Sequence, residues 1–164
     1  MIAFTLTLIA AAFLNALKAG FLFAFAVVVM PGTKNLRDRE FLDSFRVIDR
    51  VIQNNQPLFM VMWLGSTLCL VAAALLAIRS ISGLERMLVI ACALANLFLI
   101  QLPTMTINIP LNNQLQALDL DNQDADTIRT ARVAFESKWN RWNVIRTIVS
   151  CIVLALLLVV LSRC

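Results

Sequence analysis

The sequence contains neither histidine nor tyrosine, and these absences exclude several kinds of chemistry. Without histidine there is no haem with a histidine ligand, none of the usual zinc sites and no Ser/His or Cys/His catalytic pair. The four glycines are isolated, so no phosphate-binding loop is present. The acidic run 119–126 lacks the central glycine of a calcium loop. We therefore expect no metal and no cofactor.

Cysteines are few and dispersed along the chain. The four of them are Cys69, Cys92, Cys151 and Cys164. No two are close in sequence, and three lie inside apolar segments, so a disulfide framework or metal knuckle is not expected. We interpret them as small residues that pack against apolar neighbours.

What the chain has in excess is apolar residues, which make up 60% of it. A soluble domain is about half apolar. Four apolar segments approach the length of about 20 residues that crosses a bilayer: 2–30, 58–78, 87–107 and 144–162. We predict a single all-α domain, 1–164, folded as a four-helix transmembrane bundle whose main partner is the lipid bilayer. The net charge of +4 reflects the loops, and no nucleic acid is expected.

The segments between the spans are also predicted to be partly helical. Residues 36–54 form an amphipathic pattern with an apolar stripe, which indicates a surface helix with Asp49 among the solvated charges. Residues 124–143 indicate a surface helix that leads into the fourth span. Loops 31–56 and 108–143 carry most of the lysines and arginines, so they are predicted to be cytoplasmic, with both termini extracytoplasmic.

Lys18 is the most unusual residue within the spans. It lies about 18 Å of helix from the nearer end of the first span, too deep to reach water easily. No Asp or Glu occurs inside any span, so its neighbours are predicted to be Asn15 and Asn96. Three arrangements would accommodate it: a neutral amine, a hydrated cavity, or an anionic or phenolic ligand. A purely structural lysine, held by amide oxygens, is the alternative to a functional one.

A second polar group is predicted where the fourth span begins. Read as a helix, Trp139, Trp142, Asn143 and Arg146 share one face. The guanidinium needs polar partners there, and the amides of another stretch after the third span are the best candidates. These amides are Asn108, Asn112 and Asn113. The cup they form is predicted to bind a ligand, although the same amides would also satisfy the backbone near a helix break.

Small residues recur at every fourth position of the first span, namely Ala12, Ala16, Gly20 and Ala24. Such a ladder lets two helix backbones approach closely. It is the predicted face for a homo-oligomer or another membrane partner.

Four motifs together resemble the anthrone-oxygenase-like membrane proteins, most bacterial members of which are known only as a domain of unknown function. The motifs are Val29-Met30-Pro31-Gly32, the stretch 48–59, Asn108-Ile109-Pro110-Leu111-Asn112-Asn113, and 139–147. The named members are fungal enzymes that oxidise anthrones to anthraquinones, in reactions thought to need neither metal nor flavin. The resemblance implies a four-helix membrane protein.

Two functions remain open from the sequence. The first is a cofactor-independent oxygenase that acts on a lipophilic phenolic molecule, with Lys18 and Arg146 as the candidate catalytic residues. The second is a non-enzymatic protein that binds a hydrophobic molecule or serves as an accessory subunit. A transporter is less consistent with the sequence, because it shows no intramembrane acid pair and no inverted repeat.

Overall fold

The structure is a computed structural model, and it describes residues 1–163. Over this range helices are its only regular secondary structure, as predicted. The elements in order are α1 (Ile2–Ala24), η1 (Phe25–Val29), α2 (Met30–Thr33), α3 (Asp38–Gln53), α4 (Pro57–Ser80), α5 (Gly83–Ala95), η2 (Asn96–Gln101), η3 (Thr104–Asn108), α6 (Ile109–Ala117) and α7 (Ala125–Leu161), where η marks a π-helix.

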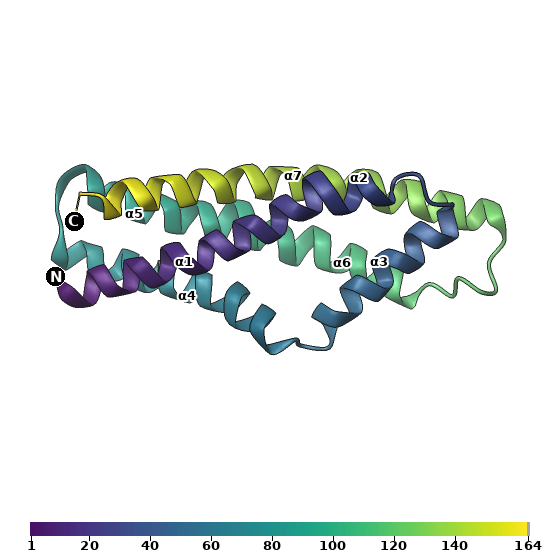
Figure 1. The fold of residues 1–164 in the computed structure, drawn as a ribbon, viewed down its shortest axis with the longest axis horizontal. Helices are drawn as coiled ribbons and strands as arrows, with labels where there is room; N and C mark the ends of the chain where they lie inside the picture. Colours follow the sequence, from purple (N-terminus) through teal and green to yellow (C-terminus); the bar gives the residue numbers. More distant parts are fainter. Residues whose placement is uncertain (164) are drawn as a thin grey trace.

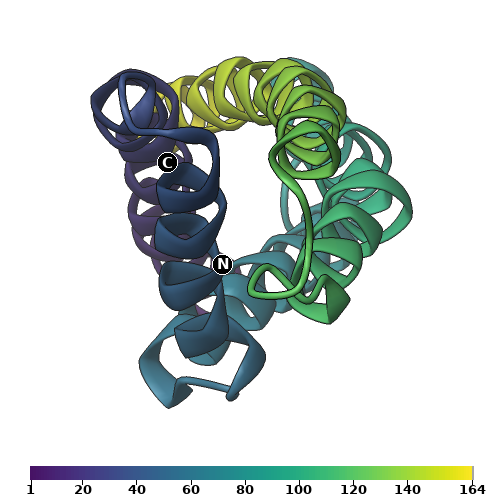
Figure 2. The same ribbon diagram turned by 90° about the vertical axis from the view of Figure 1, so that its right-hand side faces the viewer.

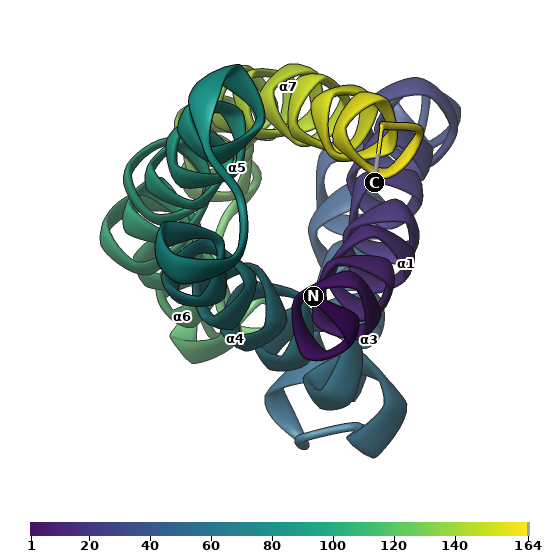
Figure 3. The same ribbon diagram turned by 90° about the vertical axis from the view of Figure 1, so that its left-hand side faces the viewer.

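Four continuous helices are long and apolar enough to cross a membrane: Ile2–Thr33, Pro57–Ser80, Gly83–Ala117 and Ala125–Leu161. The predicted four-helix bundle is therefore confirmed, and the chain is a multi-pass membrane protein. Both termini lie at one end of it, which we call the termini end (Figure 1). Viewed from that end, α1, α4, α5 and α7 form a closed ring (Figure 3).

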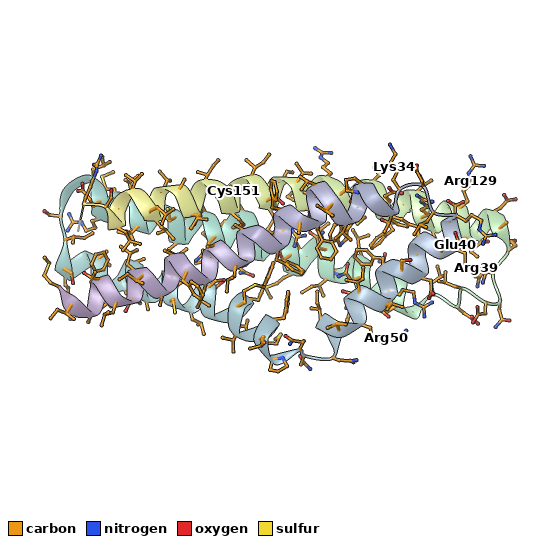
Figure 4. The ribbon with its side chains drawn as sticks, viewed as in Figure 1. Lys34, Arg39, Glu40, Arg50, Arg129 and Cys151 are labelled. Carbon is orange, nitrogen blue, oxygen red and sulfur yellow. The ribbon has the colours of Figure 1, made fainter. Side chains whose placement is uncertain are left out.

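The opposite end, which we call the charged end, is built differently. Here α3 and α6 join the N-terminal half of α7 (Figure 2). Side chains of Lys34, Arg39, Glu40, Arg50 and Arg129 project from this half of the molecule, whereas Cys151 lies on α7 in the other half (Figure 4). Basic residues favour the cytoplasmic side of a membrane, so we still predict that the charged end is cytoplasmic and the termini end extracytoplasmic.

Two separate hydrophobic cores follow this division. The core of the termini end includes Phe4, Leu8, Leu70 and Leu157. The core of the charged end is aromatic, and its buried members are Phe25, Met30, Phe41, Leu42, Phe45, Leu115, Leu120, Ile128, Phe135 and Trp139. Polar side chains are buried at intermediate positions along the helices, among them Lys18, Asn96, Thr104, Asn143 and Arg146. The fold thus buries these polar side chains among the helices, whereas exposing them to lipid would be costly.

Three prolines explain the three π-helical segments. A proline ring clashes with the carbonyl group four residues earlier and cannot donate the helical hydrogen bond. The residue four positions before Pro31 lies in η1, that before Pro103 in η2 and that before Pro110 in η3. A π-helix widens the turn and so accommodates the proline without ending the helix. For this reason the Asn108–Asn113 stretch, predicted to lie past the third span, continues it as a helix.

Contacts with α7 hold α3 in place. The Arg132 guanidinium donates 2.7 Å hydrogen bonds to the carbonyl oxygens of Lys34 and Leu36, and it pairs with Asp38 at 3.0 Å. At the start of α3, hydrogen bonding from Arg37 lowers the pKa of the Glu40 carboxyl. The N-terminal part of α7, predicted as a surface helix that leads into the fourth span, is continuous with that span.

One detail of the predicted surface helix is wrong. The pattern predicts Asp49 on the solvated face, yet only 3% of its surface is exposed. Asp49 follows Phe41 and Phe45 at steps of four, so it lies on the same buried side of α3 as these two rings. Its packing partner is α6, a helix where the sequence pattern indicated a loop.

The glycines of α1 and α4 differ in how much space surrounds them. A methyl group added at Gly65 in α4 would lie 3.1 Å from Leu14 Cδ1 of α1, whereas one added at Gly20 would meet no atom within 4 Å. Within the predicted small-residue ladder, Ala12 is buried and Gly20 is exposed. The ladder therefore presents an open surface only in part, and the homo-oligomer stays a prediction.

We expect Gly65→Val to lower the free energy of unfolding by about 1–3 kcal/mol, because it overpacks the α1–α4 contact. Gly20→Val is the matched control, since its side chain enters open space. Denaturant unfolding of the purified protein in micelles measures both. Equal effects of the two substitutions would contradict this account of the α1–α4 contact, and a change of oligomer mass in Gly20→Val alone would support the ladder as an interface.

Candidate functional site

A cavity of about 430 Å³ lies between the helices on the side of the charged end. Small-molecule sites commonly have volumes of about 300–1,000 Å³. All four long helices and α3 contribute to its wall. Its aromatic residues are Phe21, Phe25, Phe45, Phe59, Trp63 and Trp139. These rings contact one another, for example Phe21 with Phe59 at 5.2 Å and Phe25 with Trp139 at 5.6 Å between ring centroids. The greater part of the wall is therefore a continuous apolar surface.

Arg146 of α7 supplies a positive charge to this wall and is only 4% exposed. Its Nη1 donates to Thr104 Oγ1 at 2.8 Å, and its Nη2 donates to Asn143 Oδ1 at 3.3 Å. The guanidinium carbon lies 5.9 Å from the centroid of the Trp139 ring. Within residues 1–163, no acidic side chain forms an ion pair with it. Its Nε has no partner, so the charge is met only by neutral groups.

Asn108 is a second polar group of the wall, and it is unusual for a different reason. Its side chain is 2% exposed, and neither its amide nitrogen nor its amide oxygen has a hydrogen-bond partner in the part of the chain that the structure describes. Buried polar atoms almost always have partners, because an unpaired one costs about 1–3 kcal/mol. Since Asn108 lines the cavity, a ligand or ordered water there would satisfy both atoms.

Towards the charged end, a network of hydrogen bonds in the wall joins α7, α6 and α3. Trp139 Nε1 donates to Asn112 Oδ1 at 3.0 Å. The amide nitrogen of Asn112 donates in turn to Asp49 Oδ1 at 2.7 Å. Gln116 donates to the other oxygen of Asp49 at 3.0 Å. The indole, the amide and the carboxylate therefore have defined orientations around the cavity.

Lys18 lies outside this wall and is completely buried. Its amine donates to Asn96 Oδ1 at 2.5 Å, and Asn96 donates to Thr67 Oγ1 at 3.2 Å. Gln101 also donates to Thr67 Oγ1, at 2.6 Å, and accepts from Trp63 Nε1 at 3.0 Å. Because Gln101 and Trp63 line the cavity, the lysine is connected to it through a chain of hydrogen bonds.

The structure brings together five of the residues that the sequence analysis selected: Asn108, Asn112, Trp139, Asn143 and Arg146. The other five lie elsewhere. Lys18 and Asn96 form the chain described above, and Asn15 donates to the carbonyl oxygens of Ala11 and Ser66 at 2.8 and 3.2 Å. Asn113 is exposed and accepts from Gln53, while Trp142 is half-buried outside the wall.

Sequence reasoning missed Thr104, Asp49 and most of the aromatic rings. Thr104 and Asn108 are four residues apart, so their shared face was a usable signal. Asp49 likewise follows the apolar stripe of its helix. The rings of Phe21, Phe59 and Trp63 gave no such signal, because a span that is apolar on every side does not reveal which face points inwards. Within residues 1–163, no group of three or more His, Cys, Asp or Glu side chains is arranged to hold a metal ion.

We expect Asn96→Leu to destabilise the protein more than Lys18→Met does. Asn96→Leu leaves a buried amine without its acceptor, which costs at least about 1–3 kcal/mol. The double variant should recover part of the loss, because both polar groups are then replaced by apolar ones. Unfolding of the four proteins in micelles gives the coupling free energy, and a double variant less stable than Asn96→Leu would disprove the pairing.

One known family shares the sequence that builds most of this site. The model of the family described as anthrone oxygenase matches residues 56–156. This range is more than half of the chain and contains Asn108, Asn112, Trp139, Asn143 and Arg146, but not Asp49. Comparison with curated proteins and with solved structures gives no match. The resemblance found in the sequence motifs is thus confirmed, and the chain belongs to the anthrone oxygenase family of integral membrane proteins.

Proposed function

We propose that the cavity binds a small, lipophilic, oxygen-bearing aromatic molecule and that the protein promotes its oxidation by molecular oxygen. The observation that carries the proposal is Arg146. Among residues 1–163 its guanidinium has no counter-ion, and it lines an aromatic cavity together with the unpartnered amide of Asn108. A carbonyl or phenolic oxygen is the kind of group that both would bind.

The apolar wall supports an aromatic ligand. Phe21, Phe25 and Phe59 form a contiguous surface, and Phe59 stacks on Trp63 with a centroid distance of 5.6 Å. Aromatic rings pack favourably on such surfaces in edge-on or offset arrangements. A lipophilic molecule also concentrates in the bilayer that surrounds the four helices. Ring stacking would supply the affinity, and the polar groups would set the orientation.

The chemistry that fits this site begins with an anthrone-like carbon acid. Transfer of a ring C–H proton to solvent gives an enolate, whose negative charge develops on the carbonyl oxygen. Arg146 and Asn108 would stabilise that oxygen, because preorganised donors act strongly on a developing negative charge. Oxygen then adds to the ring carbon, the peroxide anion takes a proton back from solvent, and the hydroperoxide loses water to give the second carbonyl. The overall change is one anthrone and one O₂ converted to one anthraquinone and one H₂O.

Lys18 is proposed to act indirectly in this reaction. Its amine does not line the cavity, so it would position Gln101 and Trp63 through Asn96 and Thr67. The ligand contacts are assigned to Arg146, Asn108, Asn112, Asn143 and Trp139. Asn15, Asn113 and Trp142, which were also predicted to bind ligand, lie outside the wall and are given no direct contact with it.

A non-enzymatic function has one observation in its favour. Apart from Arg146 and Asp49, the polar residues of the wall are amides, indoles and a threonine hydroxyl, which bind ligands but do not exchange protons near neutral pH. A protein that only binds a hydrophobic molecule would use the same cavity. Binding without turnover in the two experiments below would support this second function.

Arg146→Gln is expected to weaken binding of anthraquinone at least tenfold, because a hydrogen bond to a charged group contributes about 1.5–3 kcal/mol. Arg141→Gln is the matched control on the same helix, since Arg141 is exposed and outside the wall. Quenching of tryptophan fluorescence by the ligand measures both affinities. Equal affinities in the two variants would argue against Arg146 as a ligand-binding residue.

Purified protein in micelles is expected to consume one O₂ per anthrone, measured with an oxygen electrode and by absorbance of the anthraquinone formed. Arg146→Gln should lower kcat by about a hundredfold, as loss of an oxyanion donor commonly does. Lys18→Met should have a smaller effect, because it acts through other residues. If both variants retain the wild-type rate, the proposed mechanism is wrong.

A further inference from the structure

Asp49 is a buried carboxylate that lines the cavity and has no positively charged partner. It is 3% exposed, and within the part of the chain that the structure describes it takes part in no salt bridge. Arg46 and Arg50 are its neighbours in α3, yet neither pairs with it. Taking an unpaired carboxylate out of water is costly. Interactions other than an ion pair must therefore stabilise the buried carboxylate of Asp49.

The hydrogen bonds of Asp49 leave one of its oxygens able to accept a further donor. Oδ1 accepts from Asn112 at 2.7 Å, and Oδ2 accepts from Gln116 at 3.0 Å and from Gln53 at 3.1 Å. The bonds from Asn112 and Gln116 join α3 to α6, and they need a carboxylate because both oxygens act as acceptors. Oδ1 accepts one bond within the described residues, and a carboxylate oxygen can accept two.

The wall of the cavity carries opposite charges at two places, the carboxylate of Asp49 and the guanidinium of Arg146. Asp49 bonds to Asn112, and Arg146 bonds to Thr104, eight residues earlier on the same long helix. Eight residues correspond to about 12 Å along a helix. Asn108, with its unpartnered amide, lies midway between these two contacts. The wall therefore presents a hydrogen-bond acceptor with negative charge at one end and donors with positive charge at the other.

We propose that Asp49 determines the specificity of the site by accepting a hydrogen bond from a phenolic hydroxyl of the ligand. This inference rests on the proposed function, and it adds the residue that recognises a hydroxyl group on the aromatic ketone. The carbonyl oxygen lies at Arg146 and Asn108, and the hydroxyl group lies at Asp49, at the other end of the ring system. The two charges then hold the ligand in one orientation, with the reacting ring carbon in a fixed place.

The experiment compares anthraquinone with 2-hydroxyanthraquinone, at mildly acidic pH where the phenol is neutral. Tryptophan quenching in the full-length protein in micelles gives both affinities. The wild-type protein is expected to prefer the hydroxylated ligand about tenfold or more, since the bond is to a charged acceptor. Asp49→Asn should abolish the preference, because the amide lacks the charged acceptor. Asp43→Asn, on the exposed face of the same helix, is the matched control and should retain it.

A second comparison needs no variant. 2-Methoxyanthraquinone resembles the hydroxylated ligand but has no hydrogen to donate, so the wild-type protein should bind it no more tightly than anthraquinone. Equal affinity for the methoxy and hydroxy ligands, or a preference that survives in Asp49→Asn, would overturn the assignment. If the wild-type protein binds none of the three ligands, the proposed function fails and this inference with it. If it binds anthraquinone without preferring the hydroxyl, only this inference fails.

Discussion

The charge on Arg146 must be accommodated among helices and lipid, and much of the site follows from how this is achieved. Among the described residues no acidic side chain pairs with the guanidinium, and the groups around it are neutral: Thr104, Asn143 and the face of Trp139. Asn143 is itself held by the carbonyl oxygen of Leu22 at 3.2 Å. Because neutral acceptors compensate a charge only partly, a site that retains an open Nε is suited to an additional polar ligand.

The prolines contribute to the same arrangement through the backbone. Pro103 and Pro110 are tolerated within one continuous helix because wide π-helical turns precede them. This helix supplies Gln101, Thr104, Asn108 and Asn112 to the cavity. A regular α-helix broken at either proline would have ended before the last of these residues. The irregular backbone therefore extends the polar wall from the membrane region to α3.

The charged end covers the cavity without closing the bundle into a single core. Arg132 fixes the start of α3, and Asp49 joins the later part of the helix to α6. Aromatic rings line the cavity together with Arg146, which is only 4% exposed, and electrostatic interactions are strong for a charge removed from water. Fixed donors of this kind fit the oxyanion stabilisation that we propose for the site.

The sequence by itself determined the class of fold, the four spans and the family, because these depend on local composition and on motifs read along one chain. It also determined that Arg146 shares a helix face with Trp139 and Asn143, since helical periodicity is a local property. Only the tertiary structure decided which faces meet. It separated Lys18 from the cavity, placed Asp49 inside it and left Asn108 without partners, because these outcomes depend on contacts between helices distant in the sequence. An apolar span has no polar face from which its inward side can be read, so its aromatic wall became visible only once the helices were packed.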